Sequence, residues 1–471
     1  MTENRIDLAT PHKIHLVGVG GAGISAIGII LATMGHEVSG VDLNETPAWS
    51  SLMAAGVKVA VADSGDLFGG SDATNAEVVA HSTAFIPTDH QRANLEDQGV
   101  QVLNRAEILA LICAQKRTIA VSGTHGKTST TAMLATLLEG VGAQPSFLVG
   151  ALPLGLGRAA SWGGSGPFVV EADESDGSFL SLGADVAIVN NIDADHMDYW
   201  QSMERLEAAF DQFVADAQEA VVCIDDTKRD AVAEERALRV ARKHGALSVG
   251  ESQEARLRVH NVAVNRLETT FGLSFDGTEI GPVKVATPGR HNARNAAVAI
   301  AVAIESGISP SDAVGAIAAY RGSSRRFEVV GEFNGATVVD DYAHNPGKVR
   351  SVLSAAKEAG WDRVVVLFQP HRYSRTKNQA REFGEALALA DVVGVSEIYA
   401  AGEAPIEGVS AEMLIAATLD ERPSAIAEWL PTLDDAENWI RSQARPGDLV
   451  LTVGAGDIWR VGRSIVDSPD A

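Results

Sequence analysis

Residues 119–131 of the 471-residue chain read IAVSGTHGKTSTT, a pattern suited to holding phosphate groups. Its first three apolar residues predict a buried strand, the next five predict a turn, and a helix is expected to begin at Lys127. At such a turn, free backbone N–H groups and the positive end of the helix dipole converge, and Gly123 and Gly126 let the backbone approach phosphate oxygens closely. Lys127 would add a charge to the β- and γ-phosphates, and the Thr128 hydroxyl would reach a magnesium ion.

This loop departs from the usual phosphate-binding pattern at one position. Val121 stands where a glycine five residues before Gly126 is usual, and the nearer glycine, Gly123, lies only three residues before it. A glycine turn that merely precedes a lysine is the alternative interpretation. The order of strand, turn, Gly-Lys-Thr and helix favours phosphate binding.

Side chains that could hold a metal ion follow two further predicted strands. Glu171 comes directly after the apolar run at 168–170, and His196 lies in the polar segment after the run at 185–189. Magnesium takes few protein ligands and prefers hard oxygens. We therefore expect Thr128, Glu171 and His196 to form the metal site.

The acids near these residues exceed what one ion requires. Three more carboxylates follow Glu171, namely Asp173, Glu174 and Asp176. Some of them would simply be solvated. His196 could instead be an imidazole hydrogen-bonded inside its own loop, where Asp193 and Asp195 are available to fix its tautomer.

A second glycine-rich turn lies near the N-terminus. A strand is predicted at 13–17, four glycines follow it, a helix is expected over 24–34, and a strand at 37–41 ends at Asp42. This order matches the dinucleotide-type fingerprint, in which an acid about twenty residues after the glycines binds a ribose. The motif alone is weak, because a tight helix–strand contact would need the same glycines and the nucleotide stays unidentified.

Polar residues also follow buried strands in the last third of the chain. Tyr342 and His344 come after the apolar run at 335–339, and Arg372 and Arg375 come after the run at 364–368. The carboxyl ends of parallel strands meet at one edge of a sheet. Two arginines at such an edge suit planar, bidentate recognition of a carboxylate or phosphate, whereas arginines on an open surface would need no such explanation.

Buried strands alternate with helices through most of the chain, which indicates an α/β fold with mostly parallel sheets. We expect three domains: an N-terminal Rossmann-like domain over 1–107, a central phosphate-loop domain with a mostly parallel sheet and helices over 108–323, and a C-terminal Rossmann-like domain over 324–471. The alternating pattern at 257–275 predicts a hairpin at the edge of the central domain.

Composition excludes several classes of function. Hydrophobic residues make up 46% and charged residues 21% of the chain, as in ordinary globular proteins. A formal charge of −24 argues against nucleic-acid binding, which needs a basic surface. We expect Cys113 and Cys223 to be reduced core residues. Without a signal segment or an apolar run of membrane-spanning length, we expect a cytoplasmic protein with no membrane insertion.

Taken together, nine motifs resemble the successive motifs of the Mur ligases: HLVGVGGAG, SGTHGKTSTT, EADESDGSF, NIDADHMDYW, GRHNARNA, RRF, DDYAHNP, FQPHRYSRT and GAGDI. The resemblance runs from His15 to about Asp457, and it accounts for the unusual phosphate loop, which is the family's own form. In DDYAHNP, Ala343 and Asn345 stand where family members more often have a glycine and a second histidine.

The resemblance is strongest to the branch that joins L-alanine to UDP-N-acetylmuramate in the first peptide step of peptidoglycan precursor synthesis. It implies an ATP-dependent, ADP-forming, amide-forming enzyme that uses Mg²⁺ and is a monomer or homodimer. The lactyl carboxylate of the sugar would attack the γ-phosphate to give an acyl phosphate. The amine of L-alanine would then displace phosphate through a tetrahedral intermediate.

The resemblance also implies roles for individual residues. UDP-sugar contacts are expected from Gly18, Gly20, Gly21, Gly23, Asp42, Ser82, Thr83 and Arg105. ATP contacts are expected from Gly123, Thr124, His125, Gly126, Lys127, Thr128, Ser129, Asn292, Asn295, Arg326 and Asp341. The amino acid and acyl phosphate are expected to meet Tyr342, His344, Arg372 and Arg375. Lys127, His196, His344, Arg372 and Arg375 are the expected catalytic residues, with His344 a candidate for accepting the ammonium proton.

Three alternatives remain open from the sequence. A recycling ligase that joins a tripeptide to the same sugar nucleotide would share nearly every motif. A nicotinamide-dependent oxidoreductase would explain the N-terminal glycines and Asp42 but would leave the phosphate loop and the acids unused. A non-catalytic nucleotide-binding protein would have little use for Glu171, His196 and the paired arginines together.

Overall fold

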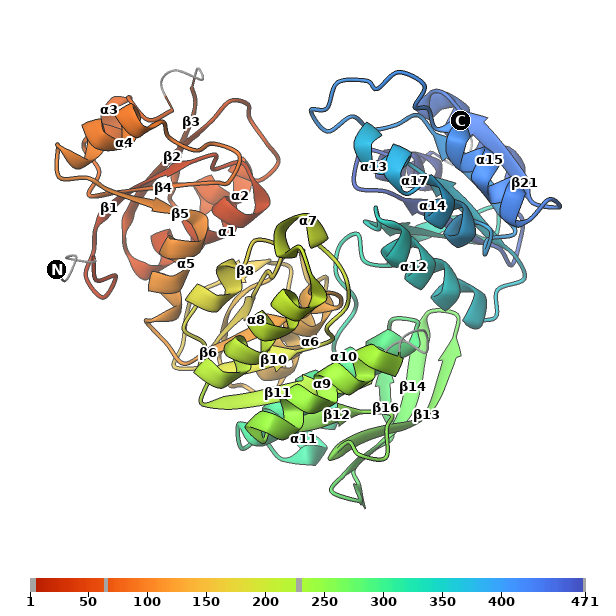
Figure 1. Ribbon diagram of the computed structural model, residues 1–471, viewed down its shortest axis with the longest axis horizontal. Coiled ribbons are helices and arrows are strands. Elements are labelled where there is room, and N and C mark those ends of the chain that lie inside the picture. Colours follow the sequence, from red (N-terminus) through yellow and green to blue (C-terminus); the bar gives the residue numbers. More distant parts are fainter. Residues whose placement is uncertain (1–5, 63–66, 226–230, 469–471) are drawn as a thin grey trace. The chain divides into compact units, whose positions relative to one another are not determined.

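The computed structural model of the protein describes residues 6–62, 67–225 and 231–468, with the side chains of 231–234 left aside. Strands and helices alternate along the chain, as Figure 1 shows. Two compact units are formed, one by residues 1–260, 272–283 and 294–320, the other by residues 261–271, 284–293 and 321–471. The first unit carries the N-terminal sheet and most of the central sheet, whose strands at 257–265, 268–275 and 283–285 are divided between the units, and the second unit carries the C-terminal sheet.

The N-terminal sheet of the first unit is parallel throughout. Its strands, in the spatial order β3-β2-β1-β4-β5, are β1 (Lys13–Val17), β2 (Glu37–Asp42), β3 (Lys58–Val61), β4 (Val78–His81) and β5 (Gln101–Asn104). Its helices are α1 (Ala22–Met34), α2 (Trp49–Ala54), α3 (Ser71–Thr74), α4 (Asp89–Glu96) and α5 (Arg105–Cys113). The strand order reverses between β1 and β4, and ligands of open α/β sheets bind at the carboxyl side of such a reversal.

Helix α1 has an apolar sequence and ends at a glycine. It is nearly buried along its length, with Ile24, Ile27 and Leu31 inside the core. Gly35 ends it with a φ of 101°, a left-handed conformation that glycine adopts without strain, and its N–H donates to the carbonyl of Ala32. The predicted helix over 24–34 is thereby confirmed, with its start two residues earlier.

The central sheet is mixed. Its strands are β6 (Thr118–Ser122), β7 (Ser146–Leu148), β8 (Ala160–Ser161), β9 (Phe168–Glu171), β10 (Val186–Val189), β11 (Glu219–Cys223), β12 (Leu247–Gly250), β13 (Leu257–Asn265), β14 (Glu268–Phe275), β15 (Thr278–Glu279) and β16 (Val283–Val285). They run in the order β15-β14-β13-β12-β11-β10-β6-β9-β7-β8, with β16 beside β14. Strand β6 pairs in parallel with β10 and with β9, so the carboxyl ends of these three strands meet.

Helices α6 (Lys127–Gly140), α7 (Met197–Trp200), α8 (Met203–Asp216), α9 (Ala231–His244), α10 (Arg290–Glu305) and α11 (Pro310–Ile317) accompany this sheet, with a 3₁₀ turn at Ser178–Ser181. Both cysteines, Cys113 and Cys223, are buried and outside any disulfide, as expected. Across the described residues, every helix is too short or too polar to cross a membrane.

The second unit holds a six-stranded sheet in the order β17-β18-β22-β19-β20-β21. Its strands are β17 (Glu328–Phe333), β18 (Ala336–Asp341), β19 (Val364–Phe368), β20 (Val392–Ser396), β21 (Ile426–Leu430) and β22 (Leu449–Val453), of which only β17 is antiparallel to its neighbour. The helices are α12 (Pro346–Glu358), α13 (Tyr373–Asn378), α14 (Ala380–Leu387), α15 (Glu412–Glu421), α16 (Leu433–Gln443) and α17 (Trp459–Asp467).

The fold class expected from the sequence is confirmed: the chain is α/β with mostly parallel sheets. The hairpin expected at 257–275 is also present as β13 and β14, with its turn at Arg266. The domain boundaries near 107 and 323 stay predictions.

Candidate active site

The loop between β6 and α6 has the backbone geometry of a phosphate cradle. Gly123 has a φ of 128° and Gly126 a φ of 83°, conformations that disfavour any side chain. A Cβ at Gly126 would lie 2.7 Å from Oδ1 of Asn295, and one at Gly123 would lie 3.0 Å from Asn190. The loop therefore requires glycine at both positions, for conformation and for space.

Residues that follow β10 hold this loop in place. The side chain of Asn191 accepts a hydrogen bond from the His125 N–H at 2.8 Å and donates one to the His125 carbonyl at 3.0 Å. Thr124 exchanges hydrogen bonds with the backbone of Asp193, at 3.1 and 3.0 Å. With its turn fixed from outside, the loop is shaped before any ligand arrives.

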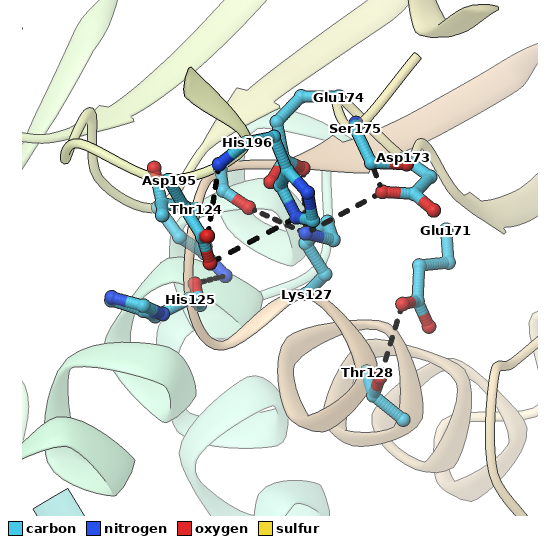
Figure 2. Close-up of polar contacts among 12 residues, drawn as sticks. Thr124, His125, Lys127, Thr128, Glu171, Asp173, Glu174, Ser175, Asp195 and His196 are labelled. Carbon is cyan, nitrogen blue, oxygen red and sulfur yellow. Dashed lines mark hydrogen bonds and ion pairs between the residues drawn. The ribbon is translucent and has the colours of Figure 1, made fainter. Parts of the chain in front are cut away.

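Lys127 lies at the centre of the site, surrounded by carboxylates (Figure 2). Its Nζ lies 2.6 Å from Oε2 of Glu174 and 3.9 Å from Oδ1 of Asp173, and it donates to the carbonyl of Gly123 at 2.9 Å. The exposed fraction is 13% for the Lys127 side chain and 2% for that of Glu174. Burial alone would lower the pKa of Lys127, but the two carboxylates outweigh it and raise the pKa, so the ammonium stays charged.

Two of the predicted metal ligands are in direct contact. Thr128, in the first turn of α6, donates its hydroxyl to Oε1 of Glu171 at 3.1 Å, as Figure 2 shows. The Gly150 N–H donates to the other carboxylate oxygen of Glu171 at 3.0 Å. A hydroxyl and a carboxylate beside a phosphate loop are hard oxygen ligands of the kind that Mg²⁺ takes. Among the described residues, no three histidine, cysteine or acidic side chains form a metal-binding cluster of their own.

His196, the third predicted ligand, lies in the loop after β10. It has a left-handed backbone with a φ of 54°, and its N–H donates to Oδ1 of Asp195 at 2.9 Å. Its Nε2 lies 3.8 Å from Oδ2 of the same aspartate (Figure 2). Of the two partners suggested by the sequence, Asp195 makes these contacts, and Oδ2 of Asp193 lies 3.8 Å from Nε2 of His125.

A cleft of about 400 Å³ lies over the strand reversal of the N-terminal sheet. Seven of the eight residues predicted to contact the UDP-sugar line it: Gly18, Gly21, Gly23, Asp42, Ser82, Thr83 and Arg105. Gly20 is the exception, and its N–H donates to Oδ2 of Asp42 at 2.8 Å. Asp173, Ser175 and Asp176, which follow β9, line the same cleft, so it leads to the surroundings of Lys127.

In the second unit, four aromatic rings form a row along the carboxyl edge of the sheet. The ring centroids of Tyr342 and His344 are 5.2 Å apart, those of His344 and His371 are 5.8 Å apart, and those of His371 and Tyr399 are 5.7 Å apart. These residues come from the loops after β18, β19 and β20. The parallel sheet thus brings together side chains from three loops that are far apart in the sequence.

His344 is neutral and has a defined tautomer. Its Nδ1 lies 3.0 Å from the carbonyl of Tyr342, and since a carbonyl only accepts, Nδ1 carries the hydrogen. Nε2 is left as a hydrogen-bond acceptor. Burial, with a smaller contribution from Lys348, lowers the pKa of His344 to about 3. The ring can accept a hydrogen bond near neutral pH, but it is a weak proton acceptor.

The predicted arginines lie at the same edge. Nη1 of Arg375 is 3.3 Å from Nδ1 of His371 and 3.5 Å from the His344 carbonyl. Arg372 precedes α13 with a left-handed φ of 74°. Arg326 lies over the Tyr342 ring, 5.5 Å from its centroid. The structure therefore brings together the residues predicted for the amino acid and one predicted for ATP.

Asp341 has a structural contact on each carboxylate oxygen. One oxygen accepts from the Ala343 N–H and the other from the Phe327 N–H, both at 2.8 Å. Burial raises the pKa of Asp341 to about 6. These contacts hold the loop that carries Tyr342, a role that the sequence did not suggest.

The remaining ATP candidates are divided between the two units. Asn295 belongs to the first unit and lies against Gly126, whereas Asn292 belongs to the second, where its Nδ2 donates to the Pro288 carbonyl at 2.8 Å. Ser129 is half-buried in the first turn of α6.

Several residues of the site were missed by the sequence analysis. Asn190 and Asn191 carry a usable signal, because two amides directly follow a buried strand. Glu174 was given only a minor role among the acids, although it pairs with Lys127. Tyr399 and Glu403 lie in the loop after β20, where nothing in the sequence pattern singles them out.

Comparison with known protein families accounts for most of the chain. Residues 13–117 match the "Mur ligase family, catalytic domain", residues 121–303 match the "Mur ligase middle domain", and residues 325–456 match the "Mur ligase, glutamate ligase domain". These three ranges follow one another without overlap, and they include eight of the nine motifs in full and the first three residues of GAGDI.

Individual relatives are similar to this chain over nearly its whole length. The UDP-N-acetylmuramate--L-alanine ligase of Paenarthrobacter aurescens is 39% identical over 473 residues, covering 99% of both chains. The crystal structure of the UDP-N-acetylmuramate-alanine ligase MurC from Thermotoga maritima has a TM-score of 0.80 and 26% identity, covering 97% of this chain and 98% of that one. A murein peptide ligase from Psychrobacter arcticus shares the fold, with a TM-score of 0.67 and 23% identity over 97% and 99% of the two chains.

Three ranges between residues 13 and 456 thus match three domains of one family in order, and they carry the phosphate loop, the cleft at the strand reversal and the arginine-bearing sheet edge. The chain belongs to the Mur ligase family.

Proposed function

We propose that this protein is an ATP-dependent ligase that joins L-alanine to the lactyl carboxylate of UDP-N-acetylmuramate, with release of ADP and phosphate. The observation that carries the proposal is the phosphate loop, whose glycine turn holds the Lys127 ammonium against the Gly123 carbonyl, with only 13% of the lysine side chain exposed. The choice of substrates is supported by the relative from P. aurescens, which carries this activity in its name and aligns with 99% of the chain.

The chemistry of activation follows from charge. A carboxylate that approaches a triphosphate is repelled, so the developing charge on the transferring phosphoryl group must be neutralised. Lys127 supplies one positive charge there. Thr128 and Glu171, with His196, would hold Mg²⁺, which when bound would supply further positive charge on the phosphate oxygens. The sugar nucleotide would lie in the cleft lined by Arg105.

The second half of the reaction needs a neutral amine. In our proposal Nε2 of His344 accepts a hydrogen bond from the ammonium group of L-alanine and orients it, while Arg372 and Arg375 bind its carboxylate and the acyl phosphate. Because the pKa of His344 is about 3, the ring would orient the amine rather than keep its proton. In this proposal the final proton acceptor is solvent or the departing phosphate rather than His344, the candidate named from the sequence.

Phosphate release tests the proposal. The protein would be incubated with ATP, Mg²⁺ and UDP-N-acetylmuramate, together with L-alanine, L-serine, glycine, the tripeptide or no amine. We expect release that requires both the sugar nucleotide and L-alanine. Release that occurs only with the tripeptide would identify the recycling ligase instead, and release that continues without any amine would contradict ligation.

Three further properties belong to the proposal. A ligase of cytoplasmic sugar nucleotides would itself act in the cytoplasm. Mg²⁺ is proposed from the Thr128–Glu171 pair, and removal of the ion with EDTA should abolish turnover. We also propose a monomer or homodimer, which light scattering at assay concentration would distinguish from larger assemblies.

A further inference from the structure

The loop that follows β20 contacts the arginine-bearing helix at its first turn. Glu403 accepts two hydrogen bonds from Ser374, one from its hydroxyl at 2.6 Å and one from its N–H at 3.0 Å. Ser374 lies between Arg372 and Arg375 in sequence. A single carboxylate from a distant loop therefore holds the segment that carries both predicted substrate-binding arginines.

This contact is part of a larger connection between the two loops. The Arg372 N–H donates to the Tyr399 carbonyl at 2.9 Å, and the Tyr399 N–H donates to the Pro370 carbonyl at 2.8 Å. The Tyr399 ring stacks on that of His371 with an interplanar angle of 12°. The loop after β20 thus follows the loop after β19 along its backbone, and Glu403 completes the attachment.

Helix α13 needs such an attachment because it lacks a cap of its own. It begins after Arg372, whose left-handed φ of 74° is unfavourable for a side chain of this size, and no side chain within the helix caps its first turn. The Glu403 carboxylate performs that function from outside, since it accepts the Ser374 N–H. Hydrogen bonds to the carboxylate lower the pKa of Glu403, which keeps it ionised.

We infer that Glu403 is a positioning residue for amino-acid binding: through Ser374 it fixes α13 so that Arg372 and Arg375 present their guanidinium groups to the incoming amino acid. This inference rests on the proposed function, because it assigns the arginine pair to L-alanine. Glu403 itself touches neither substrate nor reacting atoms in this account. Its removal should therefore act on amino-acid affinity and leave nucleotide affinity unchanged.

The test compares Glu403→Ala, Glu403→Gln and Ser374→Ala in the full chain, with Glu407→Ala as the matched control. Glu407 is an exposed carboxylate of the same loop. Gln keeps one acceptor but places an amide N–H₂ where the Ser374 N–H or hydroxyl must donate. We expect both Glu403 variants to raise KM for L-alanine about tenfold, as the loss of a charge-assisted positioning contact would. KM for ATP and for UDP-N-acetylmuramate should change less than about twofold.

The Ser374→Ala and Glu403→Ala effects should also be non-additive, because both remove the hydrogen bond from the Ser374 hydroxyl to the Glu403 carboxylate. The inference is overturned if Glu403→Ala behaves like Glu407→Ala, or if all three KM values rise together with a lower melting temperature, the sign of a merely structural role. If wild-type protein shows no alanine-dependent turnover, the proposed function itself fails. If the wild-type protein shows alanine-dependent turnover and Glu403→Ala leaves KM for L-alanine unchanged, only the positioning role is contradicted.

Discussion

The ion pair between Lys127 and Glu174 predicts a stability effect that ATP should modify. With Nζ and Oε2 at 2.6 Å, Coulomb attraction is about 6 kcal/mol at an effective dielectric constant of 20, before the cost of burying both charges. Glu174→Gln keeps the shape and one acceptor oxygen but removes the charge. Asp173, at 3.9 Å, still neutralises the lysine. Burial raises the pKa of Glu174, so desolvation offsets part of the attraction, and we expect a loss of about 2–3 kcal/mol, at or below the range for breaking a buried pair.

Urea unfolding with and without ATP and Mg²⁺ checks this prediction. In wild type, the ammonium must leave a carboxylate to bind phosphate, whereas in Glu174→Gln it is already released from its nearest anion. The variant should therefore gain more stability from the nucleotide than wild type does. Asp198→Asn, which alters an exposed acid in α7, is the control and should change neither value. Equal stability of Glu174→Gln and wild type without nucleotide would refute the reasoning.

Three further predictions follow from the site. Lys127→Met should abolish turnover. It should also lower the free energy of unfolding by about 3 kcal/mol, because it leaves Glu174 buried without its cation. The double variant Lys127→Met/Glu174→Gln should recover stability but not phosphate release. In steady-state kinetics, His344→Ala should raise KM for L-alanine about tenfold and leave KM for ATP unchanged. A change in KM for ATP alone would contradict the assignment of His344 to L-alanine. Burial raises the pKa of Asp341 from 3.8 to about 6, so the folded chain binds more protons than the unfolded chain between these two pH values. The contribution of Asp341 to the free energy of unfolding therefore falls by about 3 kcal/mol as the pH rises from the lower value to the higher. Asp341→Asn should remove this pH dependence from denaturation midpoints, and an unchanged slope would contradict the assigned pKa.

Much of the fold could be predicted because buried strands are short apolar runs bounded by glycine or polar residues. The strand predicted at 13–17 and the run at 364–368 correspond to β1 and β19 with the same limits. The phosphate loop was recognisable for the same reason, since strand, glycine turn and helix are neighbours in sequence. The contact of Thr128 with Glu171 follows from the parallel pairing of β6 with β9.

Contacts that depend on side-chain direction or on distant loops were not predictable. Which acid pairs with Lys127 depends on how the chain turns after β9, and Glu174 rather than a more distant acid reaches it. Whether Asp193 or Asp195 contacts His196 could not be predicted, because the answer depends on the left-handed backbone at His196. Glu403 is 29 residues from Ser374, and only the packing of the two loops brings them together.

Oxygen transfer tests the central claim most directly. UDP-N-acetylmuramate labelled with ¹⁸O in both lactyl carboxylate oxygens would be incubated with the protein, ATP, Mg²⁺ and L-alanine, and the products analysed by mass spectrometry. If the carboxylate is activated as an acyl phosphate, one ¹⁸O atom must appear in the released phosphate and the other must remain in the amide carbonyl. Phosphate without the label, formed together with the alanyl product, would contradict the account.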